Sequence, residues 1–236
     1  MSNYEVSNKE FNDFLASLKK SGNSVDYNIA KIDTNNWVTE FNEAYMAPFS
    51  KQYHTNEAYN NYPLVNITLE GAKLYCKWLT AELNSENQQA NFKIAVRLPS
   101  RVQWLRASFA NYKNAAYSWG SSYLRNDKGQ FMCNFKNIGA ENIYFNQETN
   151  SYHVKEKNIS YVLDNALATA PIDSYFPNDF NLYNLNGNVA ELVVDGITCG
   201  GSWNSTGYDV RNQSINDFEE SSSTIGFRPL LLISSK

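Results

Sequence analysis

An amide and a carboxylate, Asn184 and Glu191, stand on either side of an Asn186-Gly187 step and could bind a hard cation together. Glycine accepts the backbone conformations of a sharp turn, so the chain can double back between these two side chains. Calcium takes about six to eight oxygens from carboxylates, amides and backbone carbonyls, and such a turn can supply them. The alternative interpretation is an ordinary tight turn at Asn186-Gly187, with Glu191 as a surface carboxylate.

The sequence contains few side chains suited to other kinds of catalytic chemistry. The three cysteines, Cys76, Cys133 and Cys199, are too few for a disulfide scaffold and are expected to be small buried hydrophobes, although Cys133 and Cys199 could pair. The two histidines, His54 and His153, lie in unrelated contexts, which disfavours a non-haem iron site. We expect His54 to be exposed or hydrogen-bonded. Neither a Gly-x-Ser-x-Gly motif nor a P-loop is present, which argues against the enzymes that carry them.

The elements that must position these side chains are clearest in the first half of the chain. A capping box at Ser7–Glu10 predicts an amphipathic helix over residues 8–20. A second capping box at Ser100–Gln103 opens another helix, after a short strand over residues 93–98. Between them Thr68 caps a helix with an apolar face made by Ala72, Tyr75, Cys76, Leu79 and Leu83.

Elsewhere the periodicity is weak. Residues 21–65 are expected to be loop-rich, with one short helix near residues 36–44 and several aromatic anchors. The stretch 143–154 predicts a β-hairpin with His153 facing the solvent. Two further strands are expected, over residues 200–203 and 225–233. No domain boundary is visible, so residues 1–236 are interpreted as one α+β domain.

Composition limits the classes of partner. The net charge of −4 argues against nucleic acid, because phosphate binding needs a basic face. No apolar run approaches the length of a membrane span, and the first residues do not form a signal peptide. Aromatic residues make up 14% of an asparagine-rich chain, which predicts irregular backbone held by rings and amide hydrogen bonds.

Several stretches together resemble the formylglycine-generating-enzyme (sulfatase-modifying factor) superfamily. The longest is Phe176–Glu191, followed by Gly200–Trp203 and Gly226–Arg228. Upstream matches occur in order at Glu5–Asn8, Tyr62–Asn66, Ala72–Trp78, Arg97–Ser100 with Trp104, and Tyr117–Gly120. This resemblance covers nearly the whole chain. It implies the α+β, C-type-lectin-like fold of that superfamily, low in regular secondary structure.

The resemblance also implies structural calcium, as one or two ions. One ligand set would combine the side chains of Asn184 and Glu191 with the carbonyls of Gly187 and Val189. A second set would combine the side chains of Asn134 and Asp164 with the carbonyls of Phe135 and Ala166. Calcium use favours an extracytoplasmic location, in the periplasm or cell envelope.

The catalytic pair of that superfamily is missing. Its enzymes oxidise a peptide cysteine with two cysteine thiolates that hold cuprous copper, and the matching positions here are Ser205 and Val210. We therefore expect no bound copper and name no catalytic residue. Cys199, on the other side of Gly200-Gly201, is a poor replacement. A possible ligand surface remains at Ser205, Tyr208 and Arg211, beside Asn204 and a Trp203 that we expect to be core.

Three functions follow from this pattern. The favoured one is a non-catalytic module that binds or scaffolds a protein or peptide, similar to relatives in cell-envelope, gliding-motility or secretion assemblies. The alternative is a divergent metal-dependent oxidase acting on a peptide cysteine. Calcium-dependent glycan binding ranks last, because the site at Asn184 and Glu191 looks closed by its own backbone.

Overall fold

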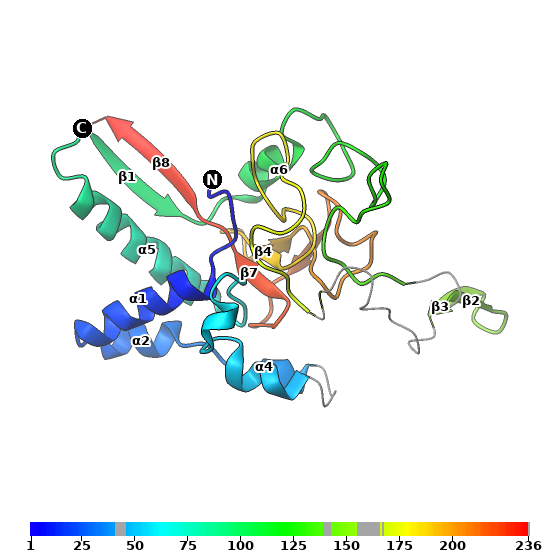
Figure 1. The fold of residues 1–236 in the computed structure, drawn as a ribbon, viewed down its shortest axis with the longest axis horizontal. Coiled ribbons are helices and arrows are strands. Elements are labelled where there is room, and N and C mark those ends of the chain that lie inside the picture. Colours follow the sequence, from blue (N-terminus) through cyan, green and yellow to red (C-terminus); the bar gives the residue numbers. More distant parts are fainter. Residues whose placement is uncertain (41–45, 139–142, 155–165, 167, 236) are drawn as a thin grey trace.

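The computed structural model describes residues 1–236 except 41–45, 139–142, 155–165, 167 and 236 (Figure 1). Its helices are α1 (Asn8–Lys20), α2 (Ser24–Ala30), α3 (Asn36–Thr39), α4 (Ala47–Gln52), the 3-10 helix η2 (Glu57–Tyr59), α5 (Leu69–Glu86) and α6 (Arg101–Phe109). Its strands are β1 (Phe92–Arg97), β2 (Ile143–Asn146), β3 (Ser151–Val154), β4 (Ala190–Leu192), β5 (Ile197–Cys199), β6 (Ile215–Asp217), β7 (Ile225–Phe227) and β8 (Leu230–Ser235). The expected mixture of helices, short strands and much irregular backbone is confirmed.

The three longest helices begin where their caps predict. The Ser7 side chain accepts from the Glu10 N–H, and the Glu10 carboxylate accepts from the Ser7 N–H at 2.8 Å, so the capping box is complete. Thr68 accepts from the Gly71 N–H at 3.0 Å at the start of α5. A complete box also opens α6. Within each cap, the side chain and the backbone group that it bonds lie within four residues in the sequence. Such caps can therefore be recognised from the sequence alone.

The segment between α1 and α5 contains more helix than the sequence predicts. The helix expected near residues 36–44 is α3, but α2, α4 and η2 have no counterpart in the prediction. These helices span 7, 6 and 3 residues, too few turns to produce a visible hydrophobic period. His54 follows α4 and is buried. Its ring contacts Asn8 Oδ1 at 3.0 Å and Asn66 Nδ2 at 3.4 Å, which confirms the hydrogen-bonded interpretation.

Two sheets organise the body of the molecule. β1 and β8 pair antiparallel along α5, while β6-β5-β4-β7 form a four-stranded sheet in which β4 and β7 run parallel. The strand expected over residues 200–203 is wrong: β5 ends at Cys199, because Gly200 and Gly201 have φ of +82° and +65°. The strand expected over 225–233 is divided, because Arg228-Pro229 separates β7 in one sheet from β8 in the other.

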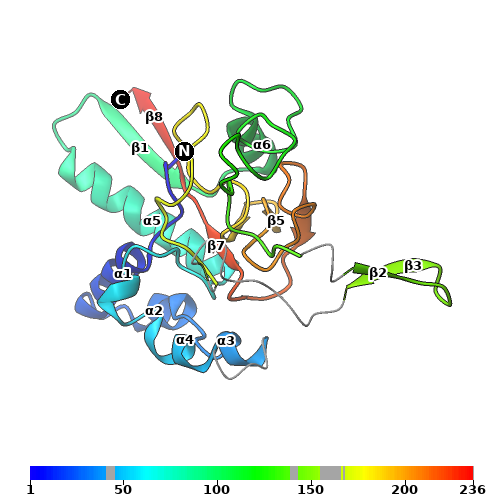
Figure 2. The same cartoon turned by 45° about the vertical axis from the view of Figure 1, so that its right-hand side comes forward.

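The predicted hairpin is present as β2 and β3, and it projects from the body in both views (Figures 1 and 2). Its rings are partly exposed, with Tyr152 at 76%. His153 is only partly buried, and its Nε2 contacts the hydroxyl oxygens of Thr149 and Ser151 at 2.8 and 3.0 Å. Among the described residues, no helix combines the length and apolar character needed to span a bilayer.

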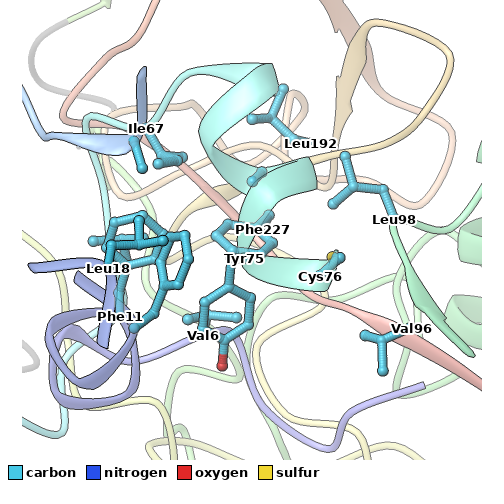
Figure 3. Packing of buried hydrophobic residues seen from close by; sticks show 14 residues of the cluster. Val6, Phe11, Leu18, Ile67, Tyr75, Cys76, Val96, Leu98, Leu192 and Phe227 are labelled. Carbon is cyan, nitrogen blue, oxygen red and sulfur yellow. The ribbon is translucent and has the colours of Figure 1, made fainter. Parts of the chain in front are cut away.

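The largest core cluster lies between α1, α5 and the strands β4 and β7. Figure 3 shows Phe11 and Leu18 of α1 facing Tyr75 of α5, with Phe227 beside Tyr75 and Cys76 on the side of Val96 and Leu98. Each large apolar side chain buried in this way contributes about 1.5–3 kcal/mol to folding. The three cysteines are buried in three different clusters and form no disulfide, so the interpretation as small buried hydrophobes is confirmed and the Cys133–Cys199 pairing is wrong.

Candidate functional site: a buried polar network and an open groove

Glu191 lies at the centre of a buried ion pair. Its carboxylate accepts from Arg228 Nη2 at 2.7 Å, from Arg228 Nε at 3.0 Å and from Trp104 Nε1 at 2.7 Å. Glu191 is 1% exposed and Arg228 is 0% exposed, so the interpretation of Glu191 as a surface carboxylate is wrong. The remaining guanidinium N–H groups donate to the carbonyls of Ser2, Asn3 and Tyr183. Arg228 therefore joins the N-terminal segment to the central motif.

A second buried carboxylate, Glu5, lies beside this pair. Its two oxygens accept from Asn184 Nδ2 at 3.1 Å and from Asn188 Nδ2 at 2.9 Å. Burial raises the pKa of Glu5 to about 8; Arg228 opposes this shift and the charge of Glu191 adds to it. Because Arg228 is ion-paired with Glu191, we infer that the Glu191 carboxylate carries the charge and that Glu5 is neutral below about pH 8.

This raised pKa predicts a pH-dependent stability. A glutamate in the unfolded chain has its ordinary pKa of 4.5, whereas the pKa of folded Glu5 is about 8, so its contribution to stability is complete below pH 4.5 and declines as the pH rises towards 8. The slope for one such group is about 1.4 kcal/mol per pH unit. We expect Glu5→Gln to flatten the fall of the unfolding free energy between pH 5 and 8, as measured in urea. Parallel wild-type and variant profiles would contradict this assignment.

Buried asparagines hold the irregular backbone around the network. Asn188 Oδ1 accepts from the Ala170 N–H at 2.8 Å and from Asn134 Nδ2 at 3.2 Å. Asn186 Nδ2 donates to the Val210 carbonyl at 2.7 Å, and its Oδ1 accepts from the Ser118 N–H at 2.8 Å. Such amides replace the regular hydrogen bonds of a sheet, as the asparagine-rich composition predicts.

The first predicted calcium set fits the ion only in part. The Asn184 Oδ1 atom is buried and has no hydrogen-bond partner among the described residues, which suits a cation ligand. Glu191 does not suit one, because Arg228 and Trp104 already use its oxygens and Arg228 supplies the compensating charge. Gly187 lies at the tight turn and Val189 packs in an aromatic cluster. Within the described ranges, no group of three or more His, Cys, Asp or Glu side chains is placed to hold a metal.

The second predicted set is described only in part. Asp164 lies outside the described residues. Asn134 is buried, and its Nδ2 donates to the Ala168 carbonyl at 2.7 Å. Phe135 packs beside the cluster of Tyr117, Cys133 and Val210, and Ala166 lines a small surface pocket. This set therefore stays a prediction.

Ser205 and Val210, the positions where the resemblance predicts the catalytic cysteines, are structurally different from each other. The Ser205 hydroxyl accepts from the Ser202 N–H at 3.0 Å, whereas Val210 is fully buried. Cys199 is 2% exposed, and burial raises the pKa of its thiol to about 12. A metal needs the thiolate, so this cysteine is a poor copper ligand at neutral pH.

An open groove of about 480 Å³ is lined in part by Tyr208 and Arg211, close to Val210 in sequence. Two of the predicted surface residues line it together. Tyr208 is 72% exposed, and the Arg211 guanidinium carbon lies 3.3 Å from the centre of its ring. Ser205 does not line the groove, Asn204 is partly buried, and Trp203 is core as expected. The lining residues are Asn114, Ala115, Ala116, Ser122, Tyr208, Arg211, Gln213 and Ser214.

Three important residues were not assigned a role from sequence, namely Glu5, Asn212 and Arg228, and Asn186 was expected only as part of a tight turn. Glu5 and Arg228 do lie in the motifs Glu5–Asn8 and Gly226–Arg228, which carried the resemblance. A signal was therefore present, but nothing in the sequence connects these motifs to Glu191. Asn212 Nδ2 donates to the Ala115 carbonyl at 3.0 Å, and its Oδ1 accepts from Asn186 Nδ2 at 3.0 Å. These two amides tie the central motif to the groove.

Comparison with known proteins gives distant relatives. The formylglycine-generating enzyme of Thermomonospora curvata is 26% identical over 135 residues, which are 57% of this chain and 34% of that protein. The formylglycine-generating enzyme of Mus musculus is 24% identical over 136 residues, which are 58% of this chain and 28% of that protein. The matched part therefore spans about a third of the length of these curated relatives.

Solved structures and a family model complete the comparison. Treponema denticola variable protein 1 aligns with a TM-score of 0.51 at 14% identity, over 88% of this chain and 83% of that one. PvdO from Pseudomonas aeruginosa aligns with a TM-score of 0.49 at 16% identity, over 75% and 63%. Residues 1–231 match the family model described as the sulfatase-modifying factor enzyme 1-like domain. The chain therefore belongs to the sulfatase-modifying factor enzyme 1-like family and has its α+β, C-type-lectin-like fold, as the sequence motifs predicted.

Proposed function

We propose that this chain is a non-catalytic binding module that holds a peptide or protein segment in the groove at Tyr208 and Arg211. The proposal rests on a contrast between the expected copper-binding positions and the groove at Tyr208 and Arg211. Where the resemblance puts a copper-binding cysteine pair, this chain has a hydrogen-bonded Ser205 and a buried Val210. The open groove keeps an exposed aromatic ring and an arginine, residue types that often anchor interfaces.

The competing function, a metal-dependent oxidase, has less support. It would need Cys199 or another ligand set to hold the metal, and Cys199 is a buried neutral thiol. Glycan binding through calcium has less support still, because Glu191 is buried in its ion pair. A role in a cell-envelope, gliding-motility or secretion assembly extends our proposal by family resemblance, and fractionation of source cells with an antibody would test it.

Two measurements test the binding function against the oxidase. First, the protein is titrated with cuprous copper and assayed for oxygen consumption on a cysteine-containing peptide; we expect no tight copper binding and no turnover. Second, fluorescent hexapeptide pools are titrated, and we expect saturable binding that Tyr208→Ala weakens. Tyr152→Ala is the matched control, because Tyr152 is 76% exposed and lies on the hairpin instead of in the groove. Copper-dependent turnover would replace the binding function with the oxidase.

We propose that calcium binds only at the second predicted ligand set, the one that contains Asn134 and Asp164. We expect added calcium to raise the melting temperature of chelator-treated protein, and Asp164→Asn to abolish the rise, because the carboxylate brings the charge. The first set should not respond, since Arg228 already balances Glu191. A calcium-induced rise in melting temperature that persists in Asp164→Asn would instead favour calcium binding at Asn184 and Glu191. No rise in the wild-type protein would remove calcium from the proposal.

A further inference from the structure

We propose that the occupant of the groove is an acidic peptide segment, and that the Arg211 guanidinium receives one of its carboxylates. This inference rests on the proposed binding function and adds the chemical class of the ligand. It is drawn from the hydrogen bonding of Arg211, from the residue types around it and from the rigidity of the loop that carries it.

The Arg211 side chain is held in place but not neutralised. Its guanidinium lies over the Tyr208 ring, and its Nε donates to the Tyr208 carbonyl at 3.0 Å. Among the described residues, no ion pair involves Arg211 and no acceptor takes its Nη groups. Two parallel N–H donors on a fixed guanidinium match the two oxygens of a carboxylate. Arg211 therefore has its bidentate edge available to a ligand.

The residues that line the groove carry a positive charge at Arg211, whereas the whole chain has a negative net charge. The chain carries a net charge of −4, yet no Asp or Glu of the part that the structure describes lines the groove. Asp209, next to Tyr208 in sequence, accepts from Thr206 Oγ1 at 2.6 Å. A second guanidinium reaches the rim, because Arg101 Nη2 donates to the carbonyl of the lining residue Gln213 at 3.4 Å. Charge complementarity therefore favours an acidic ligand and disfavours a basic one.

The neutral lining residues suit a peptide backbone. Asn114, Ser122, Gln213 and Ser214 provide amides and hydroxyls, which can donate to and accept from main-chain groups. The exposed Tyr208 ring adds an apolar surface for a neighbouring side chain. A groove of about 480 Å³ has room for a short segment.

Both walls of the groove are fixed before a ligand arrives. The Asn212 N–H donates to the Ala116 carbonyl at 2.8 Å, and Asn212 Nδ2 donates to the Ala115 carbonyl at 3.0 Å. The loop that carries Arg211 is thus bonded to the opposite wall at adjacent residues. A preorganised arginine loses little freedom on binding, which increases the affinity for a carboxylate.

Paired peptide pools test the inference. One fluorescent hexapeptide pool has glutamate at a fixed central position, and the matched pool has glutamine there. We expect the wild-type protein to bind the glutamate pool about tenfold more tightly, and Arg211→Gln to lose that preference. Arg125→Gln is the matched control: Arg125 also lies over a ring, 3.8 Å from the centre of Phe131, and donates to a backbone carbonyl, but it does not line the groove.

The outcomes separate this inference from the function on which it rests. Equal binding of the two pools overturns the acidic ligand and leaves the peptide-binding function in place. Binding of neither pool overturns both. A preference that Arg211→Gln retains, or that Arg125→Gln loses, overturns the assignment to Arg211. Melting curves of both variants confirm that each is folded before it is titrated.

Discussion

Replacing Arg228 by methionine is expected to lower the free energy of unfolding by about 3–5 kcal/mol. Methionine keeps much of the apolar volume but leaves Glu191 as an uncompensated buried charge. The carbonyls of Ser2, Asn3 and Tyr183 also lose their guanidinium donors. Urea denaturation followed by tryptophan fluorescence measures the change.

Two companion variants show whether burial of the charge is the cause. Lys9→Met breaks an ion pair whose side chains are 64% and 59% exposed, and it should have little effect on the free energy of unfolding. The double variant Arg228→Met with Glu191→Gln should recover part of the loss, because no charge is then left unpaired. An Arg228→Met protein as stable as Lys9→Met would show that the buried pair contributes little.

The second large effect is expected at the central turn, where Gly187→Ala should leave little or no folded protein. Gly187 has φ of +76°, and a Cβ there would lie 2.1 Å from the Asn134 carbonyl oxygen. That oxygen cannot easily retreat, because it accepts from the Asn188 N–H at 2.8 Å. The substitution therefore combines a strained backbone with a clash between main-chain atoms, and we expect a loss greater than about 4 kcal/mol.

Gly129→Ala separates these two causes. Gly129 has the same φ of +76°, but nothing lies within 4 Å of the position of its Cβ. Gly129→Ala should therefore lower the free energy of unfolding by the cost of the strained backbone alone, about 1–2 kcal/mol. The comparison is made by urea denaturation, with expression level and circular dichroism for a variant that does not fold. Equal losses at the two glycines would mean that the contact with Asn134 does not matter.

The sequence by itself was sufficient wherever the signal is local. The helices α1, α5 and α6 begin at their predicted caps, because a capping side chain bonds a backbone group three residues away. The family was equally readable, because its motifs are short stretches met in order. The expectation that Ser205 and Val210 occupy the positions of the catalytic cysteines follows from the resemblance and from residue type alone.

Predictions failed where residue type did not determine the partner. The turn around Gly187 was predicted. The partner of Glu191 could not be predicted from residue type, and in the structure its carboxylate is ion-paired with Arg228. The strand expected over residues 200–203 failed for a related reason. Gly200 and Gly201 take positive φ where Gly200 packs against the Leu185 carbonyl, a contact that the local sequence does not show.

The sequence alone was enough to identify the family and the long helices. What only the tertiary structure decided was the pairing of Glu191 with Arg228, the burial of Glu5 beside it, and the hydrogen bond from Asn212, the neighbour of Arg211, to the Ala115 carbonyl. The physical reason is separation along the chain: Glu5 and Arg228 stand at opposite ends of it. Their electrostatic interaction depends on how the segments between them pack, and no spacing rule encodes that.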